Sequence, residues 1–286
     1  MIGMRRSAVG LWLAIFGVLL AAGGAGILLA SPRQRPGSLG DASASSPPPP
    51  AQAVAVVGGG KVPYPESDGR LRVRIADREP ARLPADGVPP GWTLKEFVGH
   101  ASIELVRDGR LAARLRSERT SFAMHRDVVV ELREFPYLSW AWKVTKLPAA
   151  GDVREAGRDD QAAQVYVIFP RWPSPRTSSD VIGYVWDSRA PVGTRLKHPR
   201  AENVRIVVVE SGAARLNEWR LYERNVAADY TAFFGRQPPR VGKLAIMVDS
   251  NDTRGEAEAL FGDLTFARMP QGRTEGSMEI PTTVLR

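Results

Sequence analysis

Short segments in which polar and apolar side chains alternate recur along most of the chain. The first is Arg70-Leu71-Arg72-Val73-Arg74-Ile75, in which every second residue is apolar. This two-residue period is typical of a strand with one buried face. Further strand-like segments, separated by Pro and Gly, are residues 128–132, 138–144, 164–169, 182–186, 204–210, 219–226, 244–248 and 260–266.

A β-hairpin is predicted around Asp108-Gly109, because apolar-rich segments flank this pair at residues 103–106 and 111–115. Glycine tolerates the positive φ angle that such a tight turn requires. One short helix is predicted at residues 227–234, ended by Gly235 and Pro238. No helical pattern of 10–15 residues separates the strands, which argues against βαβ units. The predicted fold class is therefore all-β, an antiparallel β-sandwich with one short helix.

The first sixty residues have a different pattern. Arg5 and Arg6 precede 24 uncharged residues, from Ser7 to Ala30, most of them apolar. A helix of that length can cross the ~30 Å core of a bilayer. Small residues at Gly23 and Ala25 leave a cleaved signal peptide open as the alternative to an anchor. Either form predicts a periplasmic or cell-surface protein, associated with the membrane through this segment or secreted by it.

Four regions follow from these patterns. Residues 1–30 form the signal peptide or anchor, and residues 31–60 a linker rich in Pro, Gly, Ser and Ala. Residues 61–268 form the β-sandwich domain, and residues 269–286 a poorly ordered polar tail.

The composition of the 286-residue chain limits its chemistry. It has no cysteine, which excludes disulfides, thiolate metal sites and thiol nucleophiles. The net charge of +8 comes from basic and acidic residues that are interspersed, so no nucleic-acid partner is predicted. The three histidines are isolated, and neither an HExxH nor a Gly-x-Ser-x-Gly motif occurs. A catalytic triad can be dispersed along a chain, so hydrolysis stays open.

Several aromatic side chains have two interpretations. Trp140 and Trp142 share one face of a predicted strand, where they could stack on sugar rings, but a continuous apolar face favours the core. Tyr166, Tyr184 and Trp186 could form the walls of a ligand cleft. For these three residues too, the alternative is the edge of the core.

Acidic and amide side chains are the other candidates. Asp187 follows the Tyr184–Trp186 strand, and Arg224 and Asn225 could hold an anion, although a structural ion pair is favoured for Arg224. Asp249, Asn251 and Asp252 could bind calcium by bridging to Asp159, Asp160 or Asp187, since calcium takes six to eight oxygen ligands. Turns and caps are the favoured role of such loop residues. No other cofactor is predicted.

Several short segments, in order, resemble a bacterial family known only as domain of unknown function number 3047. They span roughly residues 90–268 and are Leu138-Ser139-Trp140-Ala141-Trp142-Lys143-Val144, Asp159-Asp160, Val165-Tyr166-Val167, Tyr184-Val185-Trp186-Asp187, Pro191-Val192-Gly193-Thr194, Val208-Val209-Glu210-Ser211-Gly212, Arg224-Asn225-Val226, Asp229, Phe234-Gly235, Met247-Val248-Asp249 and Phe261-Gly262-Asp263-Leu264. The family pattern Asp-x-Asp-Asn-Thr stands here as Asp249-Ser250-Asn251-Asp252-Thr253, with Asp and Asn exchanged. The resemblance implies a jelly-roll-like sandwich akin to carbohydrate-binding modules, and no known activity.

The favoured function is a non-catalytic ligand-binding domain for an envelope glycan or another saccharide. Its candidate ligand-binding residues are Tyr166, Tyr184, Trp186, Asp187, Arg224 and Asn225. This hypothesis rests on fold analogy and on aromatic and acidic residues at predicted strand ends. The alternative is a glycan-active or other hydrolase that uses a carboxylate pair.

Overall fold

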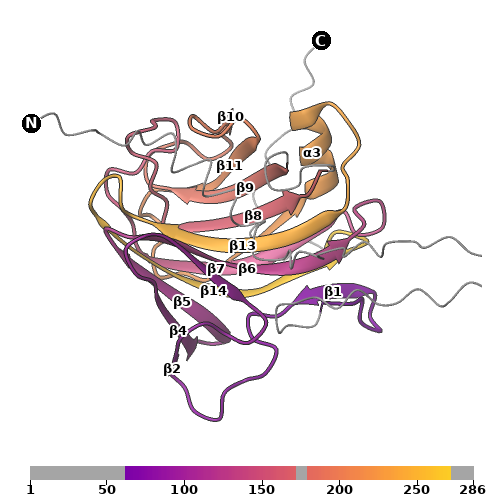
Figure 1. Ribbon diagram of the computed structural model, residues 1–286, viewed down its shortest axis with the longest axis horizontal. Coiled ribbons are helices and arrows are strands. Elements are labelled where there is room, and N and C mark those ends of the chain that lie inside the picture. The colour runs from indigo at the N-terminus through magenta and orange to yellow at the C-terminus, as the bar shows by residue number, and fades with distance from the viewer. Residues whose placement is uncertain (1–61, 172–178, 272–286) are drawn as a thin grey trace, which may run out of the picture.

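The computed structural model describes residues 62–171 and 179–271, and two twisted β-sheets dominate them (Figure 1). The predicted export segment, the linker to residue 60, and residues 272–286 of the predicted tail lie outside the described residues. Within those two ranges, no helix is both long and apolar enough to cross a membrane.

The first sheet, called sheet A, has seven strands in the order β12-β7-β14-β5-β4-β2, with β1 also beside β14. Its strands are β1 (Arg70–Val73), β2 (Ala85–Asp86), β4 (Ser102–Arg107), β5 (Leu111–Glu118), β7 (Tyr137–Lys146), β12 (Arg220–Asn225) and β14 (Glu256–Ala267).

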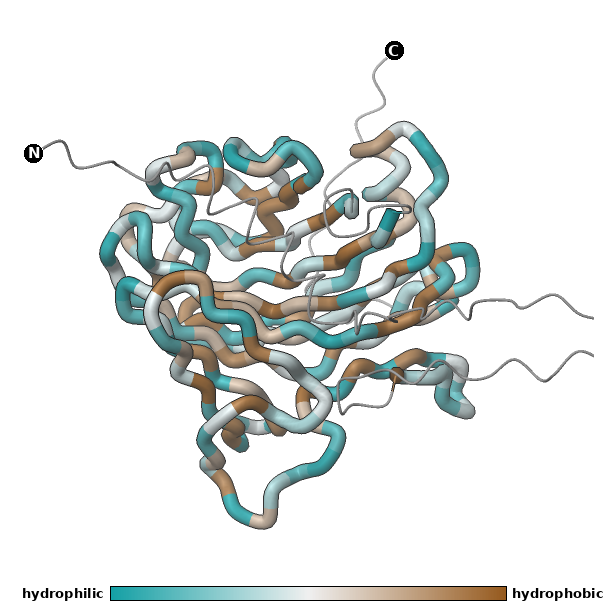
Figure 2. The backbone as a smooth tube through the Cα atoms, viewed as in Figure 1, coloured by the Kyte–Doolittle hydropathy of each residue, from teal (hydrophilic) through white to brown (hydrophobic). Residues whose placement is uncertain are grey.

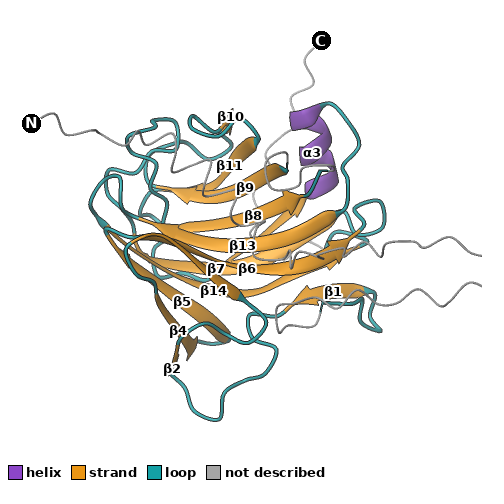
Figure 3. Cartoon of the chain, viewed as in Figure 1, coloured by secondary structure: helices purple, strands orange, loops and turns teal. Residues whose placement is uncertain are grey.

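The second sheet, called sheet B, has seven strands in the order β10-β11-β9-β8-β13-β6-β3. Its strands are β3 (Thr93–Val98), β6 (Ser121–Val130), β8 (Ala163–Phe169), β9 (Asp180–Asp187), β10 (Arg195–Lys197), β11 (Val204–Ser211) and β13 (Val241–Asp249). Figure 3 shows that strands make up most of the described fold, with the helix α3 (Val226–Phe234) at one end.

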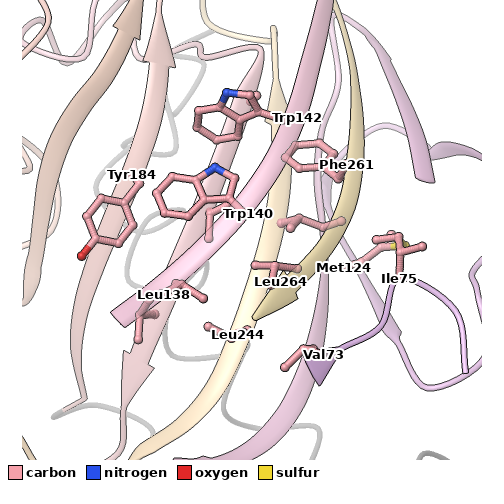
Figure 4. Close-up of a cluster of buried hydrophobic side chains, with 14 of the residues drawn as sticks. Val73, Ile75, Met124, Leu138, Trp140, Trp142, Tyr184, Leu244, Phe261 and Leu264 are labelled. Carbon is pink, nitrogen blue, oxygen red and sulfur yellow. The ribbon is translucent and has the colours of Figure 1, made fainter. Parts of the chain in front are cut away.

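The main core lies between the inward faces of the two sheets. Trp140 and Trp142 on β7 are fully buried there, so the core interpretation of this pair is confirmed. The Trp140 ring stacks on Tyr184 of sheet B at 5.2 Å between centroids, and Trp142 meets Phe261 edge-on at 6.2 Å (Figure 4). In Figure 2 the hydrophobic colour is concentrated along the strands, while the connecting loops are mostly hydrophilic.

The two strongest local signals in the sequence, a hairpin and a short helix, are both found in the structure. The predicted hairpin is confirmed, because β4 and β5 pair antiparallel with Arg107 opposite Leu111 and with Gly109 at φ 69°. Helix α3 begins at the N-cap Asn225, whose side chain accepts a 2.9 Å hydrogen bond from the backbone N–H of Ala228. It ends at Gly235, as predicted.

The all-β sandwich class is confirmed, and one parallel pair is added to it. Strands β9 and β11 run parallel, whereas the other pairs among the described strands are antiparallel. A parallel neighbour needs a crossover connection. Residues 188–203 provide it and carry the short strand β10, which pairs antiparallel with β11.

Strand β14 changes its neighbour halfway along sheet A. Residues 256–261 pair with β5, whereas residues 264–267 pair with β1 on the same side. Between these two halves, the register with β7 shifts from Phe261 opposite Trp142 to Leu264 opposite Trp140. Gly262 and Asp263 form this bulge, which keeps Phe261 and Leu264 both on the core face. The edge of the sheet is therefore interrupted between the end of β1 and the start of β5.

Candidate functional site

The three aromatic candidates are buried. Tyr184 and Trp186 point from β9 into the main core, and the Trp186 Nε1–H donates a 3.0 Å hydrogen bond to the carbonyl of Gly212. Tyr166 lies on the opposite face of sheet B, in a second apolar cluster. Its ring crosses Gly183, where an added Cβ would stand only 2.5 Å from Tyr166 Cε1. The structure therefore shows all three as packing residues and not as walls of an open cleft.

Arg224 and Asn225 also have internal partners. Arg224 binds both oxygens of Asp229, at 3.0 Å through Nε and 2.7 Å through Nη2, while Asn225 caps α3. Arg195 and the Tyr184 hydroxyl complete the set around Asp229, at 2.8 and 3.0 Å. Although burial raises the pKa of Asp229, the hydrogen bonds and charges of Arg224 and Arg195 outweigh it and hold that pKa below its ordinary value. This is the structural ion pair that the sequence favoured.

Asp187 is a loop anchor. Its buried carboxylate accepts hydrogen bonds from three backbone N–H groups, those of Val153 (2.8 Å), Arg189 (2.7 Å) and Ala190 (2.6 Å). Burial raises its pKa, and these three donors oppose that shift. It therefore joins the loop after β9 to the loop before β8.

A group of carboxylates gathers at one end of sheet B, and it is called the acidic network here. Its members are Asp159, Asp160, Asp249 and Asp252, with His198 and Arg200. The calcium hypothesis would bridge the loop after β13 to Asp159, Asp160 or Asp187, and the structure shows direct contact of this loop with Asp160. The Asp160 carboxylate accepts from the backbone N–H groups of Asp252 (3.0 Å) and Thr253 (2.6 Å) and from the Thr253 hydroxyl.

The cation in this network is a guanidinium. Arg200 Nη2 lies 3.2 Å from Asp159 Oδ2 and also forms an ion pair with Asp252. His198 Nε2 is 2.8 Å from the same Asp159 oxygen, while His198 Nδ1 accepts the backbone N–H of Arg200 at 3.1 Å. Arg200 thus bridges Asp159 and Asp252.

Asp249 is also almost fully buried. Burial, followed by the nearby charges of Asp160 and Asp159, raises its pKa well above the usual range. The backbone N–H of Asn251 donates to Asp249 at 3.3 Å, and the Asn251 amide donates to Asp252 at 3.1 Å. Within residues 62–171 and 179–271, no group of three or more His, Asp or Glu side chains is arranged to hold a metal ion.

A cavity of about 460 Å³ lies on the outer face of sheet A, and it is called the notch cavity here. It forms where the sheet edge is interrupted, between the end of β1 and the start of β5. Its floor comes from β7 and β14, through Ser139, Ala141 and Thr265. Its other lining residues are Arg70, Arg74, Ala76, Asp77, Glu79, Arg110, Leu111, Trp140, Leu221, Asp263 and Gln271.

Sequence reasoning missed this cavity, although one signal was present. The alternation in β1 places Arg70, Arg72 and Arg74 on one face of the strand. Arg72 is held by Glu66 and Asp68, while Arg70 and Arg74 line the notch. Their meeting with Arg110 depends on the change of neighbour along β14, which no local pattern reveals.

A second cavity, also about 460 Å³, adjoins the acidic network. It is lined by the loops of residues 156–157 and 197–202. Its charged side chains all have partners: Lys197 pairs with Glu202 at 3.4 Å, and His198 and Arg200 are held by Asp159. The two cavities therefore differ in how far their charges are already satisfied.

Comparisons with known proteins give a family and several similar structures. A family model described as "Protein of unknown function (DUF3047)" matches residues 90–265. No curated protein matches the chain. Among solved structures, a family 11 carbohydrate-binding module of the cellulase Lic26A-Cel5E from Clostridium thermocellum is 7% identical, covering 71% of this chain and 98% of its own, with a TM-score of 0.37.

A second similar structure is the xyloglucanase domain of NopAA from Sinorhizobium fredii. It is 11% identical and also has a TM-score of 0.37, covering 64% of this chain and 97% of its own. A xylan-binding module, CBM86, from Roseburia intestinalis is 12% identical with a TM-score of 0.26, covering 60% and 87%. The function of this chain must follow from its own residues.

Proposed function

We propose that this chain, which belongs to the family of proteins of unknown function DUF3047, is a non-catalytic ligand-binding domain for a saccharide. The notch cavity is its binding site in this proposal. Its ~460 Å³ is within the range of pockets that hold small ligands.

The observation that carries this proposal is the mixture of side chains around the notch. Arginine guanidinium groups donate hydrogen bonds, Asp263 accepts them, and Ser139, Thr265 and Gln271 can do both. Leu221, which is 57% exposed, adds an apolar surface beside them. A sugar ring presents the matching set, with hydroxyl groups around its edge and C–H groups on its faces.

One observation favours the alternative of a hydrolase with a carboxylate pair. Asp249 has a raised pKa beside Asp159 and Asp160, and such perturbed acids are frequent at active sites. However, Asp249 and Asp160 are buried and line neither of the two cavities described above. A general acid must reach the substrate, so binding without catalysis is the better-supported function.

A glycan array probed with the full-length protein tests this proposal. We expect binding to a subset of glycans without release of sugar, and loss of that binding in Leu221→Arg. The matched control is Val129→Arg, because Val129 is also 57% exposed but lies on sheet B. Absence of any glycan binding, or equal loss in both variants, would contradict the proposal.

We also propose that the domain acts outside the cytoplasm, held near the membrane or exported by residues 1–30. The support is the apolar run that follows Arg5 and Arg6. Cell fractionation with N-terminal sequencing tests it. Recovery of the uncleaved chain in the cytoplasm would contradict this localisation.

A further inference from the structure

We infer that the saccharide bound in the notch cavity is an acidic one, meaning a sugar that carries an anionic group. This inference rests on the proposed function and names its ligand class. It follows from which charged side chains around the notch are already paired and which are not.

The three arginines of the notch differ in whether they form an ion pair. Arg74 pairs with Glu66 at 3.0 Å. Among the described residues, neither Arg70 nor Arg110 forms an ion pair with a carboxylate. The Arg110 guanidinium instead lies 4.8 Å from the centre of the Trp219 ring. That ring is fixed by a 2.9 Å hydrogen bond from Trp219 Nε1–H to the Asp108 carbonyl, so Arg110 is held in place before any ligand binds.

The three carboxylates of the notch are largely satisfied. Asp77 pairs with Arg126 at 2.7 Å, and Glu79 pairs with Arg107. Asp263 accepts the backbone N–H of Ile75 at 2.7 Å and has no ion pair among the described residues. The side chains without an ion pair are therefore two cations, Arg70 and Arg110, and one anion, Asp263. Their sum is one surplus positive charge, which an anionic ligand group would neutralise.

The remaining groups suit the rest of such a sugar. Asp263 retains lone pairs that can accept hydrogen bonds from sugar hydroxyl groups, and the Gln271 amide donates a 3.1 Å hydrogen bond to the Ser139 hydroxyl on the floor. Arginine binds carboxylates and phosphates with two parallel hydrogen bonds, so either anion fits Arg70 or Arg110. The chain's net charge of +8 would also attract an acidic glycan over longer distances.

Calorimetric titration of the full-length protein with trigalacturonate and with its methyl ester tests this inference, because esterification removes the negative charges and keeps the sugar rings and their hydroxyl groups. We expect the acid to bind at least about tenfold more tightly, the size of one charge-assisted hydrogen bond. Arg70→Gln and Arg110→Gln should each reduce this preference, and the double variant should remove most of it, because the notch then has no guanidinium without an ion-pair partner. Arg240→Gln is the matched control, because Arg240 is exposed and directly precedes β13 of sheet B, away from the notch.

The outcomes separate the two proposals. Equal binding of acid and ester, or an acid preference that survives both arginine substitutions, would overturn the acidic ligand and leave saccharide binding intact. Titration with glucose 6-phosphate distinguishes a phosphorylated from a carboxylated sugar. Binding of inorganic phosphate at the affinity of the sugars would show that the notch recognises only a charge, which would overturn the inference. Failure of the glycan array would overturn the function on which it rests.

Discussion

The acidic network of sheet B and the notch of sheet A are both rich in charge, yet they use it in opposite ways. In the network, Asp159, Asp160 and Asp252 each meet a donor or a cation of the same chain. In the notch, Arg70 and Arg110 have no carboxylate partner among the described residues. Charges that satisfy each other hold loops together, whereas charges left over at a cavity are available to a ligand.

This difference also explains why the richest cluster of candidate residues is the poorer candidate site. Carboxylates removed from water must be paired or protonated. The network achieves both, through Arg200 and through the raised pKa of Asp249. Such a cluster is complete without a ligand.

The largest expected effect is on stability, from removing the network's guanidinium. Arg200→Ala leaves Asp159 and Asp252 without their cation, and we expect a loss of about 3–5 kcal/mol in the free energy of unfolding. Arg110→Ala makes the same chemical change at the notch and should alter stability by no more than about 0.5 kcal/mol. Urea unfolding of both variants measures the difference, and equal losses would remove the distinction between the two regions.

A second expected effect comes from His125, which is buried on sheet B beside Lys243, with Lys243 Nζ 3.2 Å from His125 Nδ1. Burial, followed by the Lys243 charge, lowers the pKa of His125 to about 4. In the unfolded chain His125 is protonated below about pH 6.5, whereas in the native state it stays neutral until the pH falls to about 4. Stability should therefore fall as the pH falls from about 6.5 to about 4, by about 3 kcal/mol in total.

The pH dependence of unfolding for the wild type and for His125→Gln isolates this contribution. The glutamine variant keeps a hydrogen-bond acceptor and loses the titration. A slope in this pH window that is the same in both proteins would show that His125 does not carry it.

An effect of opposite sign is expected from Asp249. Its native pKa is raised, so the native state holds its proton more tightly than the unfolded chain, and stability is lost as the pH rises. Asp249→Asn should therefore be more stable than the wild type at pH 7, and the gain should disappear near pH 4. Thermal unfolding at the two pH values measures it. Destabilisation at pH 7 would mean that the ionised carboxylate is needed.

The smallest expected effect concerns calcium. Arg200 already joins Asp252 to Asp159, and Asp160 is satisfied by the backbone of the same loop. We expect neither calcium nor a chelator to change the melting temperature of the full-length protein. A saturable rise with calcium that Asp249→Ala abolishes would instead establish a metal site in this loop.

Much of the fold could be predicted because its signals are local. The Asp108-Gly109 hairpin and the short helix before Gly235 depend on neighbouring residues alone. Strand β3 was missed. The first half of β6 was missed too, since His125, Arg126 and Asp127 interrupt the apolar pattern with polar side chains that tertiary contacts bury or pair.

The candidate sites were harder to predict, for two physical reasons. The loop at Asp249–Thr253 could be linked to Asp159, Asp160 or Asp187 only through a hypothetical calcium ion. Arg200 comes from a different loop, and its role as the bridging cation needs the fold. The notch is harder still to predict, because it exists only where the neighbour of β14 changes from β5 to β1. Pairing between distant strands leaves no periodic trace in the sequence.

A crystal structure of the full-length protein soaked with trigalacturonate tests the central claim most directly. We predict that the sugar occupies the notch, with a carboxylate within hydrogen-bond distance of Arg70 or Arg110 and with hydroxyl groups on Asp263. The acidic network should keep the Arg200 contacts it has now. A sugar bound at the cavity beside His198, with the network opened and the notch empty, would contradict the account.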